Sequence, residues 1–177
     1  MTDYEKAQAF IDNLFMGQRV WEVLKHNNYS QSFVAKKLHL SQSVFSSFIN
    51  GKHRPNYIFF YRLASFLGVS MDYLLGFSDV VFTKHPVENT EGFDETLGWV
   101  PRTKEVFDKD KRVELINNSH IESSVISHMY SGERVPPHSF FAYLALKYNV
   151  STDYLFCLTD ENKLSPGLRL KEFRKMQ

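Results

Sequence analysis

The sequence is poor in the residues that mark several large classes of protein. A single cysteine in 177 residues cannot form an internal disulfide, and it excludes the cysteine-rich zinc modules. The longest apolar runs span only a few residues, whereas a helix that crosses a bilayer needs about 20. The N-terminal residues carry acidic side chains early and lack a basic segment followed by an apolar one. We therefore expect a cytoplasmic protein without a membrane partner.

Motifs of catalysis and of metal binding are also missing. There is no glycine-rich phosphate-binding loop, no HExxH and no Gly-x-Ser-x-Gly. The seven histidines do not form i, i+4 pairs that would place two metal ligands on one helix. Cys157 lies in an apolar stretch, where we expect a core side chain rather than a reactive thiolate. We expect neither an enzyme nor a bound cofactor or metal.

The net charge of +1 conceals an uneven distribution of charged side chains. Residues 19–62 carry a net charge of +6, whereas residues 81–100 carry −3. Residues 163–177 hold five basic side chains and one acidic one. The positive potential is thus concentrated in one early segment, with a second basic patch at the end. On charge alone, a solvated surface explains these runs as well as a binding surface does.

The chain contains an internal repeat with an offset of 81 residues. NGKHRP corresponds to SGERVP, and SFLGVSMDYLLGFSD corresponds to LKYNVSTDYLFCLTD. Between residues 39–79 and 120–160, sixteen of forty-one paired positions are identical without a gap. This similarity predicts two copies of a unit of about 60 residues, although the first helix of the second copy does not align. The predicted organisation is a first unit over 1–78, a linker over 79–99, and a diverged second unit over 100–177.

Each copy reads as a series of short helices, which makes the predicted fold all-α, with two tandem five-helix units joined by an irregular linker. Serines can cap three of the helices of the first copy, and Gly51 and Gly68 can end two of them. The helices expected there span 19–28, 31–38, 42–49, 57–67 and 71–75. No segment shows the sustained period-2 alternation of a strand.

Two further helices are expected outside the repeated units. The first, over 4–15, turns Ala7, Phe10, Ile11, Leu14 and Phe15 inward, to cover the first unit or to form a dimer contact. The second, over 168–176, has apolar Leu168, Leu170 and Phe173 among basic side chains. It is either a closing helix with a solvated basic side or an additional contact for phosphates.

The predicted helix over 42–49 has an unusual outer face. On a wheel of about 100° per residue, Phe45, Phe48 and Ile49 gather on one side. The opposite side has no charged residue, although surface helices usually carry Lys and Glu there. Gln can bond an adenine edge through two atoms, Ser can bond any base, and a Val methyl can meet a thymine methyl. The candidate base-reading residues are Gln42, Ser43, Ser46 and Ser47, with Val44 at the border of the two faces.

Groups suited to phosphate binding flank this helix on both sides. Gln31 opens the preceding helix, where a side chain and backbone amides can meet a phosphate. The loop that follows contains Asn50, Lys52, His53 and Arg54. Phosphate contacts around a base-reading helix are the docking geometry of a helix-turn-helix.

Residues 19–76 as a whole resemble the Cro/lambda-repressor-type helix-turn-helix family, also called XRE. The cues are Ser30-Gln31, Ala35-Lys36-Lys37-Leu38, Leu40-Ser41, Asn50-Gly51-Lys52, Pro55, Leu63-Ala64, Leu67-Gly68-Val69-Ser70 and Asp72-Tyr73-Leu74-Leu75-Gly76. The resemblance implies that Gln31 and the loop from Asn50 to Asn56 meet phosphates, that the serine and glutamine face reads bases, and that Phe45 is buried. Many members pair an Arg of the first helix with a Glu of the third, where this chain has Leu24 and Ile49. An apolar pair can replace that ion pair without loss of the fold.

The second copy keeps the helical pattern but loses the positive charge. Glu122 stands where the first copy has the cap Ser41, and the loop Lys52-His53-Arg54 becomes Glu133-Arg134-Val135. Carboxylates at these places disfavour phosphate contacts, so we expect this unit to serve dimerisation or to receive another protein. Binding of both units to adjacent DNA sites stays open. The candidate contacts of the second unit are Ser124, Ser127, His128 and Arg134.

These observations together predict a sequence-specific DNA-binding regulator, a repressor of prokaryotic or phage type. A homodimer would bind a palindromic operator in double-stranded DNA and occlude a promoter. The alternative is a module of the same fold that binds a protein, such as an inhibitor, an anti-repressor or an antitoxin.

Overall fold

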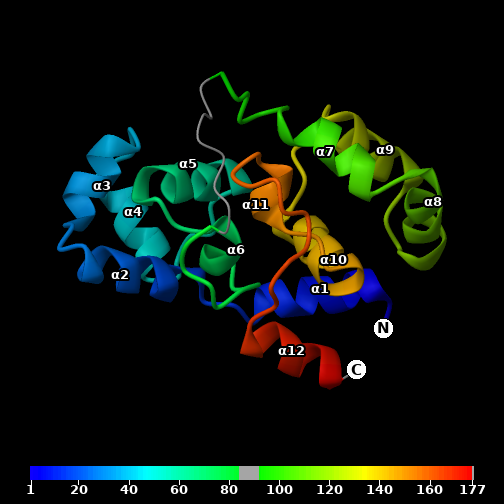
Figure 1. Ribbon diagram of the computed structural model, residues 1–177, viewed down its shortest axis with the longest axis horizontal. Helices are drawn as coiled ribbons and strands as arrows, with labels where there is room; N and C mark the ends of the chain where they lie inside the picture. The colour runs from blue at the N-terminus through cyan, green and yellow to red at the C-terminus, as the bar shows by residue number, and fades with distance from the viewer. Residues whose placement is uncertain (84–91, 177) are drawn as a thin grey trace.

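The computed structural model describes residues 1–83 and 92–176, and this part of the chain is helical (Figure 1). Its helices are α1 (Asp3–Asp12), α2 (Met16–His26), α3 (Gln31–Lys37), α4 (Gln42–Ile49), α5 (Tyr57–Leu67), α6 (Met71–Leu74), α7 (Trp99–Val106), α8 (Lys109–Asn118), α9 (Ser123–Ser131), α10 (His138–Tyr148), α11 (Thr152–Leu155) and α12 (Leu168–Lys175). The only β pairing in the described residues is an isolated bridge between Val150 and Lys163. The prediction of an all-α fold is confirmed.

The helices of the N-terminal half begin and end where the sequence predicts caps. The hydroxyls of Ser30, Ser41 and Ser70 each accept the backbone N–H three residues further on. Gly68 ends α5 in the left-handed conformation, with φ at 66°. The bounds predicted for α4 and α5 are correct, whereas α2 begins three residues earlier than predicted, at Met16. Local capping chemistry therefore sets most of these boundaries.

A continuous aromatic core runs through both halves of the molecule. Tyr57 lies at the start of α5. The centre of its ring is 5.9 Å from that of Trp99, 5.3 Å from that of Phe141 and 5.1 Å from that of Phe156. All three partners belong to the C-terminal half, and Trp99 and Phe156 are fully buried. Because aromatic side chains bury the largest apolar areas, this cluster joins the two halves into one packed body.

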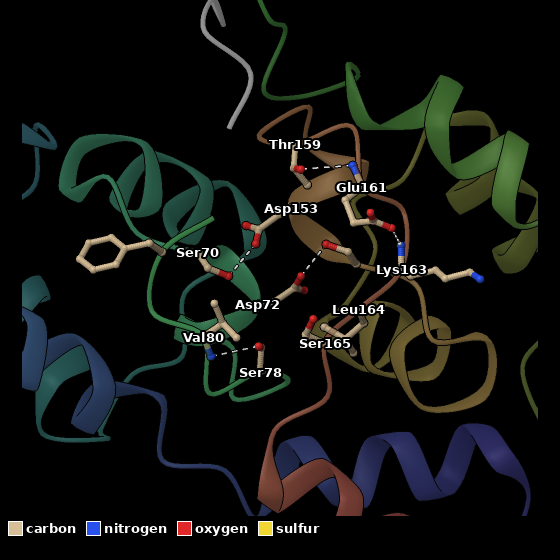
Figure 2. Close-up of a pocket in the computed structure, with 12 residues that line it drawn as sticks. Ser70, Asp72, Ser78, Val80, Asp153, Thr159, Glu161, Lys163, Leu164 and Ser165 are labelled. Atoms are coloured by element: carbon tan, nitrogen blue, oxygen red, sulfur yellow. Dashed lines mark hydrogen bonds between the residues drawn. The ribbon is translucent and has the colours of Figure 1, made fainter. Parts of the chain in front are cut away.

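Two aspartates cap each other's helices where α6 meets α11 (Figure 2). Asp153 accepts the Ser70 hydroxyl at 2.6 Å and the Met71 backbone N–H at 2.6 Å, at the N-terminus of α6. Asp72 in turn accepts the Ser151 hydroxyl at 2.6 Å and the Thr152 backbone N–H at 2.7 Å, at the N-terminus of α11. Both carboxylates are buried, and burial raises the pKa of each. Each half thus supplies the cap for a helix of the other half.

An arginine at the start of each half makes the same set of contacts. Arg19 donates to the carbonyls of Tyr73 and Ser78 and pairs with Asp79 at 2.8 Å. Arg102 donates to the carbonyls of Tyr154 and Thr159 and pairs with Asp160 at 2.7 Å. The guanidinium carbon lies 4.6 Å from the Tyr73 ring centre in the first case and 4.5 Å from that of Tyr154 in the second. These contacts place α7 at the position in the second half that α2 has in the first.

The N-terminal helix packs differently from the prediction. Ala7, Phe10 and Ile11 are buried as expected, but α1 lies mainly along α10 of the C-terminal half, not over the first unit (Figure 1). Tyr4 donates to or accepts from Ser139 at 2.8 Å there. Phe15, predicted to face inward, is 48% exposed because α1 ends at Asp12 and Phe15 begins the next helix as its N-cap. The first helix of the chain therefore covers its second half.

The C-terminal helix, α12, packs in the reverse sense, against the N-terminal half. Leu170 of α12 is fully buried, and Phe173 lies 5.3 Å from Phe10 of α1. The backbone N–H of Leu168 donates to Asp79 at 2.6 Å, which ties the start of α12 to the N-terminal half. Leu168 itself is 70% exposed. Of the predicted linker over 79–99, residues 84–91 lie outside the described residues.

Candidate nucleic-acid interface

The outer face of α4 is formed as the helical wheel predicts. Gln42 and Ser43 are exposed, and Val44 at the border is 44% exposed. Ser46 and Ser47 are half-buried. The opposite face is core, with all three of its large side chains buried, namely Phe45, Phe48 and Ile49. The result is a small, uncharged surface on a helix anchored by aromatic packing.

A tight turn sets the angle at which α4 follows α3. His39 adopts the left-handed conformation with φ at 57°, and the backbone N–H of Leu40 donates to the Ala35 carbonyl at 2.9 Å. Ser41 then caps α4 through the Val44 N–H at 3.2 Å. Three cap and turn residues thus hold α4 across α3, in the arrangement of a helix-turn-helix.

The loop after α4 presents its cations to solvent. Gly51 has φ at 72°, and an added Cβ would lie 2.8 Å from the Phe15 ring, so both conformation and space favour glycine here. Lys52, His53 and Arg54 follow and are exposed. The sequence predicted these three as phosphate contacts, and their exposure beside α4 is consistent with that prediction.

The two asparagines of the predicted phosphate set have local hydrogen-bonding roles. The Asn50 side-chain amide donates to the Ser46 carbonyl at 2.9 Å. The Asn56 side-chain oxygen accepts the backbone N–H of Ile58 at 3.1 Å, as the N-cap of α5. Both residues stay exposed, and Gln31 at the start of α3 is half-buried. The two asparagine side chains therefore shape the ends of the helices that flank the loop.

Two residues outside the predicted set contact the loop. Asp12, at the end of α1, pairs with Arg54 at 3.3 Å. His138, the first residue of α10, places Nε2 2.5 Å from the Pro55 carbonyl, and its ring lies edge-on to Phe60 at 5.3 Å. Sequence reasoning missed both contacts. The repeat gives one signal, since His138 corresponds to Tyr57, but it does not say that this position touches the loop of the other half.

Burial of His138 predicts an acid-sensitive contribution to stability. Loss of water around the imidazole lowers its pKa from 6.5 to about 4, so the ring is neutral at pH 7. Between pH 6.5 and pH 4, His138 binds a proton in the unfolded chain but not in the folded protein. The free energy of unfolding therefore falls as pH drops from 6.5 to 4, by about 3 kcal/mol.

Denaturant unfolding of the wild type and of His138→Gln across this pH range measures the effect. The glutamine retains an N–H donor for Pro55 but does not titrate, so it serves as the control for the carboxyl groups that titrate in the same range. The difference in unfolding free energy between the two proteins is expected to change by about 3 kcal/mol. A constant difference from pH 4 to 7 would contradict the assignment.

An open groove lies between α4 and α5, next to the loop. It has a volume of about 460 Å³ and is lined in part by Val44, Phe48 and Phe59, with Arg54 and Arg62 at its polar side. Val44 is thus both the border residue of the outer face and a wall of this groove. Arg62 is held by Glu95 of the following segment. Both arginines at the groove are thus paired with a carboxylate, Arg54 with Asp12 and Arg62 with Glu95.

The corresponding helix of the C-terminal half exposes a different set of groups. Ser124, Ser127, His128 and Arg134 are all exposed, as predicted. Glu122 precedes α9 and does not cap its backbone, although the Ser124 hydroxyl donates to the Glu122 carboxylate at 3.5 Å. Glu133 pairs with His128 at 3.6 Å. This end therefore carries carboxylates where the first half has a hydroxyl cap and a cation.

Comparison with known protein families gives a match in the N-terminal half. A helix-turn-helix family model matches residues 22–74, which run from α2 to the end of α6. Neither the curated proteins nor the solved structures give a match to the chain. Within the described residues, no helix is long and apolar enough to span a membrane. Residues 22–74 are therefore similar to helix-turn-helix domains of the XRE type.

Proposed function

We propose that this protein is a sequence-specific DNA-binding regulator that represses transcription by occluding a promoter. The observation that carries the proposal is the outer face of α4, which is small and uncharged between exposed cations. Such a face can approach base edges closely in a major groove. Gln42 and Ser43 at the exposed start of α4 are the main base readers, because recognition helices use their N-terminal residues. Ser46, Ser47 and Val44 add contacts further along.

The phosphate contacts come from the loop after α4 and from the start of α3. Lys52, His53 and Arg54 are exposed in the loop after α4, and Gln31 is half-buried at the start of α3. Cations at phosphates release counterions, so affinity should fall steeply as salt rises. Asn50 and Asn56 would contribute through the loop conformation that they hold.

The domain organisation supports a division of labour between the halves. We place the DNA-binding unit in residues 1–78, the linker in 79–99 and a diverged helix-turn-helix fold in 100–177. The matching contacts of Arg19 and Arg102 support a duplicated unit. Carboxylates next to α9 favour assembly or reception of a protein partner over DNA binding in that half.

A binding assay at two salt concentrations tests the proposal. We expect the purified protein to shift the duplex upstream of its own coding sequence in preference to random duplex, and to lose affinity for both at higher salt. If affinity for every duplex stays negligible at low salt, the protein-binding alternative holds instead. That alternative has one observation in its favour, namely that Asp12 partly neutralises Arg54.

The ion pair between Asp12 and Arg54 leads to a prediction of its own. Removal of the carboxylate in Asp12→Ala frees the guanidinium and takes one negative charge away from the proposed phosphate path. Because exposed pairs are worth up to about 1 kcal/mol, we expect a rise in affinity for all duplexes of up to about fivefold. Fluorescence anisotropy measures it, with Asp110→Ala on α8 as the control, and an unchanged or weaker affinity would count against the placement of Arg54.

A further inference from the structure

The contact between the two halves has the form of a two-fold interface. Ser70 and Ser151, and Asp72 and Asp153, are pairs related by the repeat offset of 81. Each aspartate caps the helix to which the other aspartate belongs, with hydrogen bonds of 2.6 to 2.7 Å on both sides. In a symmetric dimer, residue i contacts residue j while j contacts i across the axis. Here both partners belong to one chain (Figure 2).

The same relation extends to the helices that flank this contact. Tyr73 donates through its hydroxyl to Glu22, and Tyr154 donates in the same way to Glu105. Together with the contacts of Arg19 and Arg102, these bonds give each half an equivalent frame around α6 or α11. In Figure 1, α3 and α4 lie on one side of this contact, and α8 and α9 lie on the other. The halves are thus arranged as two subunits about an approximate axis.

The surface that a second copy would use at this axis is already filled. Asp72 and Asp153 are only 3% and 4% exposed, beside a small pocket of about 30 Å³ that leaves no room for a second chain. The aromatic cluster around Tyr57 seals the same contact from within. Helices α1 and α12 then cross to the opposite half at its rim. A second chain could reach α6 only after all three layers had opened.

We infer that the C-terminal half acts as a built-in partner subunit, so that one chain binds one asymmetric DNA site without a second copy. The inference rests on the proposed function for its ligand and names the class of that ligand. The two ends of the molecule differ, since Lys52 and Arg54 of the first half correspond to Glu133 and Val135 of the second. The DNA site therefore contains a single base-specific half-site, read by α4, and no inverted copy of it.

Selection from a random duplex library tests this inference together with the mass of the species formed. We expect the free protein to have the mass of one chain, 20.7 kDa, at every concentration used. The selected site should lack two-fold symmetry, and its complex on a duplex of about 25 base pairs should contain one chain. Native mass spectrometry gives both masses, and sequencing of the selected pool gives the site.

Matched variants on the two helices identify which end reads bases. Gln42→Ala on α4 should relax the selected sequence, while Ser123→Ala, at the corresponding place on α9, should change affinity less than twofold. An equal loss of sequence preference from Ser123→Ala would overturn the single half-site. A palindromic site bound by two chains, or a dimer of the free protein, would overturn the built-in partner. A complete absence of DNA binding would instead refute the proposed function, and the mass of the free protein would still test the partner role.

Discussion

Asp153→Ala is expected to lower the free energy of unfolding by about 3 kcal/mol, since two buried donors lose their acceptor. The hydroxyl of Ser70 and the backbone N–H of Met71 both bond to this carboxylate, and both residues are buried. Each buried donor left unpaired costs about 1–3 kcal/mol. Because the cap crosses between the halves, both should lose stability together.

Urea unfolding at pH 7, followed by circular dichroism, measures this effect. Asp160→Ala is the control, because it removes a carboxylate of the same half whose side chain is 79% exposed and pairs only with Arg102 among the salt bridges found. That change should cost less than about 1 kcal/mol. Asp153→Asn keeps one acceptor oxygen for the two donors, so it should fall between the two. A loss below 1 kcal/mol for Asp153→Ala would show that the exchanged caps do not hold the halves together.

Two substitutions at the proposed interface should affect DNA binding in different ways. Gln42→Ala removes a bidentate group and should reduce the preference for one base pair by roughly 10- to 100-fold, the equivalent of about 1–3 kcal/mol. Lys52→Ala should weaken binding to every duplex by about the same factor, and it should lower the slope of affinity against salt by about one. The first change acts on sequence preference, and the second acts on affinity regardless of sequence.

Competition binding with single-base variants of the selected duplex, repeated over a salt series, separates these effects. Lys109→Ala on α8 is the control for the loss of one exposed cation at the far end of the molecule. It should leave both the sequence preference and the salt slope unchanged. If Gln42→Ala and Lys52→Ala had the same effect on every duplex, α4 would not lie against base edges.

The elements that the sequence predicted well are those set by local chemistry. Ser41 and Asn50 are the caps at which α4 begins and ends. The apolar spacing of Phe45, Phe48 and Ile49 determines which face of the helix is buried. The apolar pair Leu24 and Ile49 is buried in place of the family's ion pair, as predicted. Such features depend on residues a few positions apart, so a single sequence contains the information.

The features that the sequence could not supply depend on how the halves meet. The repeat offset was visible, but it gave no sign that Asp72 and Asp153 each cap the helix of the other half. The amphipathic pattern of α1 showed which face is buried and left open which half it covers. His138 reaches Pro55 only because α10 packs beside the loop of the other unit. Long-range packing decides each of these contacts. An amphipathic pattern shows which face of a helix is buried but not which element covers it.

Photocrosslinking from matched positions on α4 and α9 tests the central claim, that α4 lies in the major groove, most directly. A benzophenone amino acid replaces Ser43 in one protein and Ser124, its counterpart in the repeat, in the other, and both are irradiated on the selected duplex. The account predicts crosslinks to bases within one half-site from position 43 and none from position 124. Crosslinks from position 124 alone would contradict it.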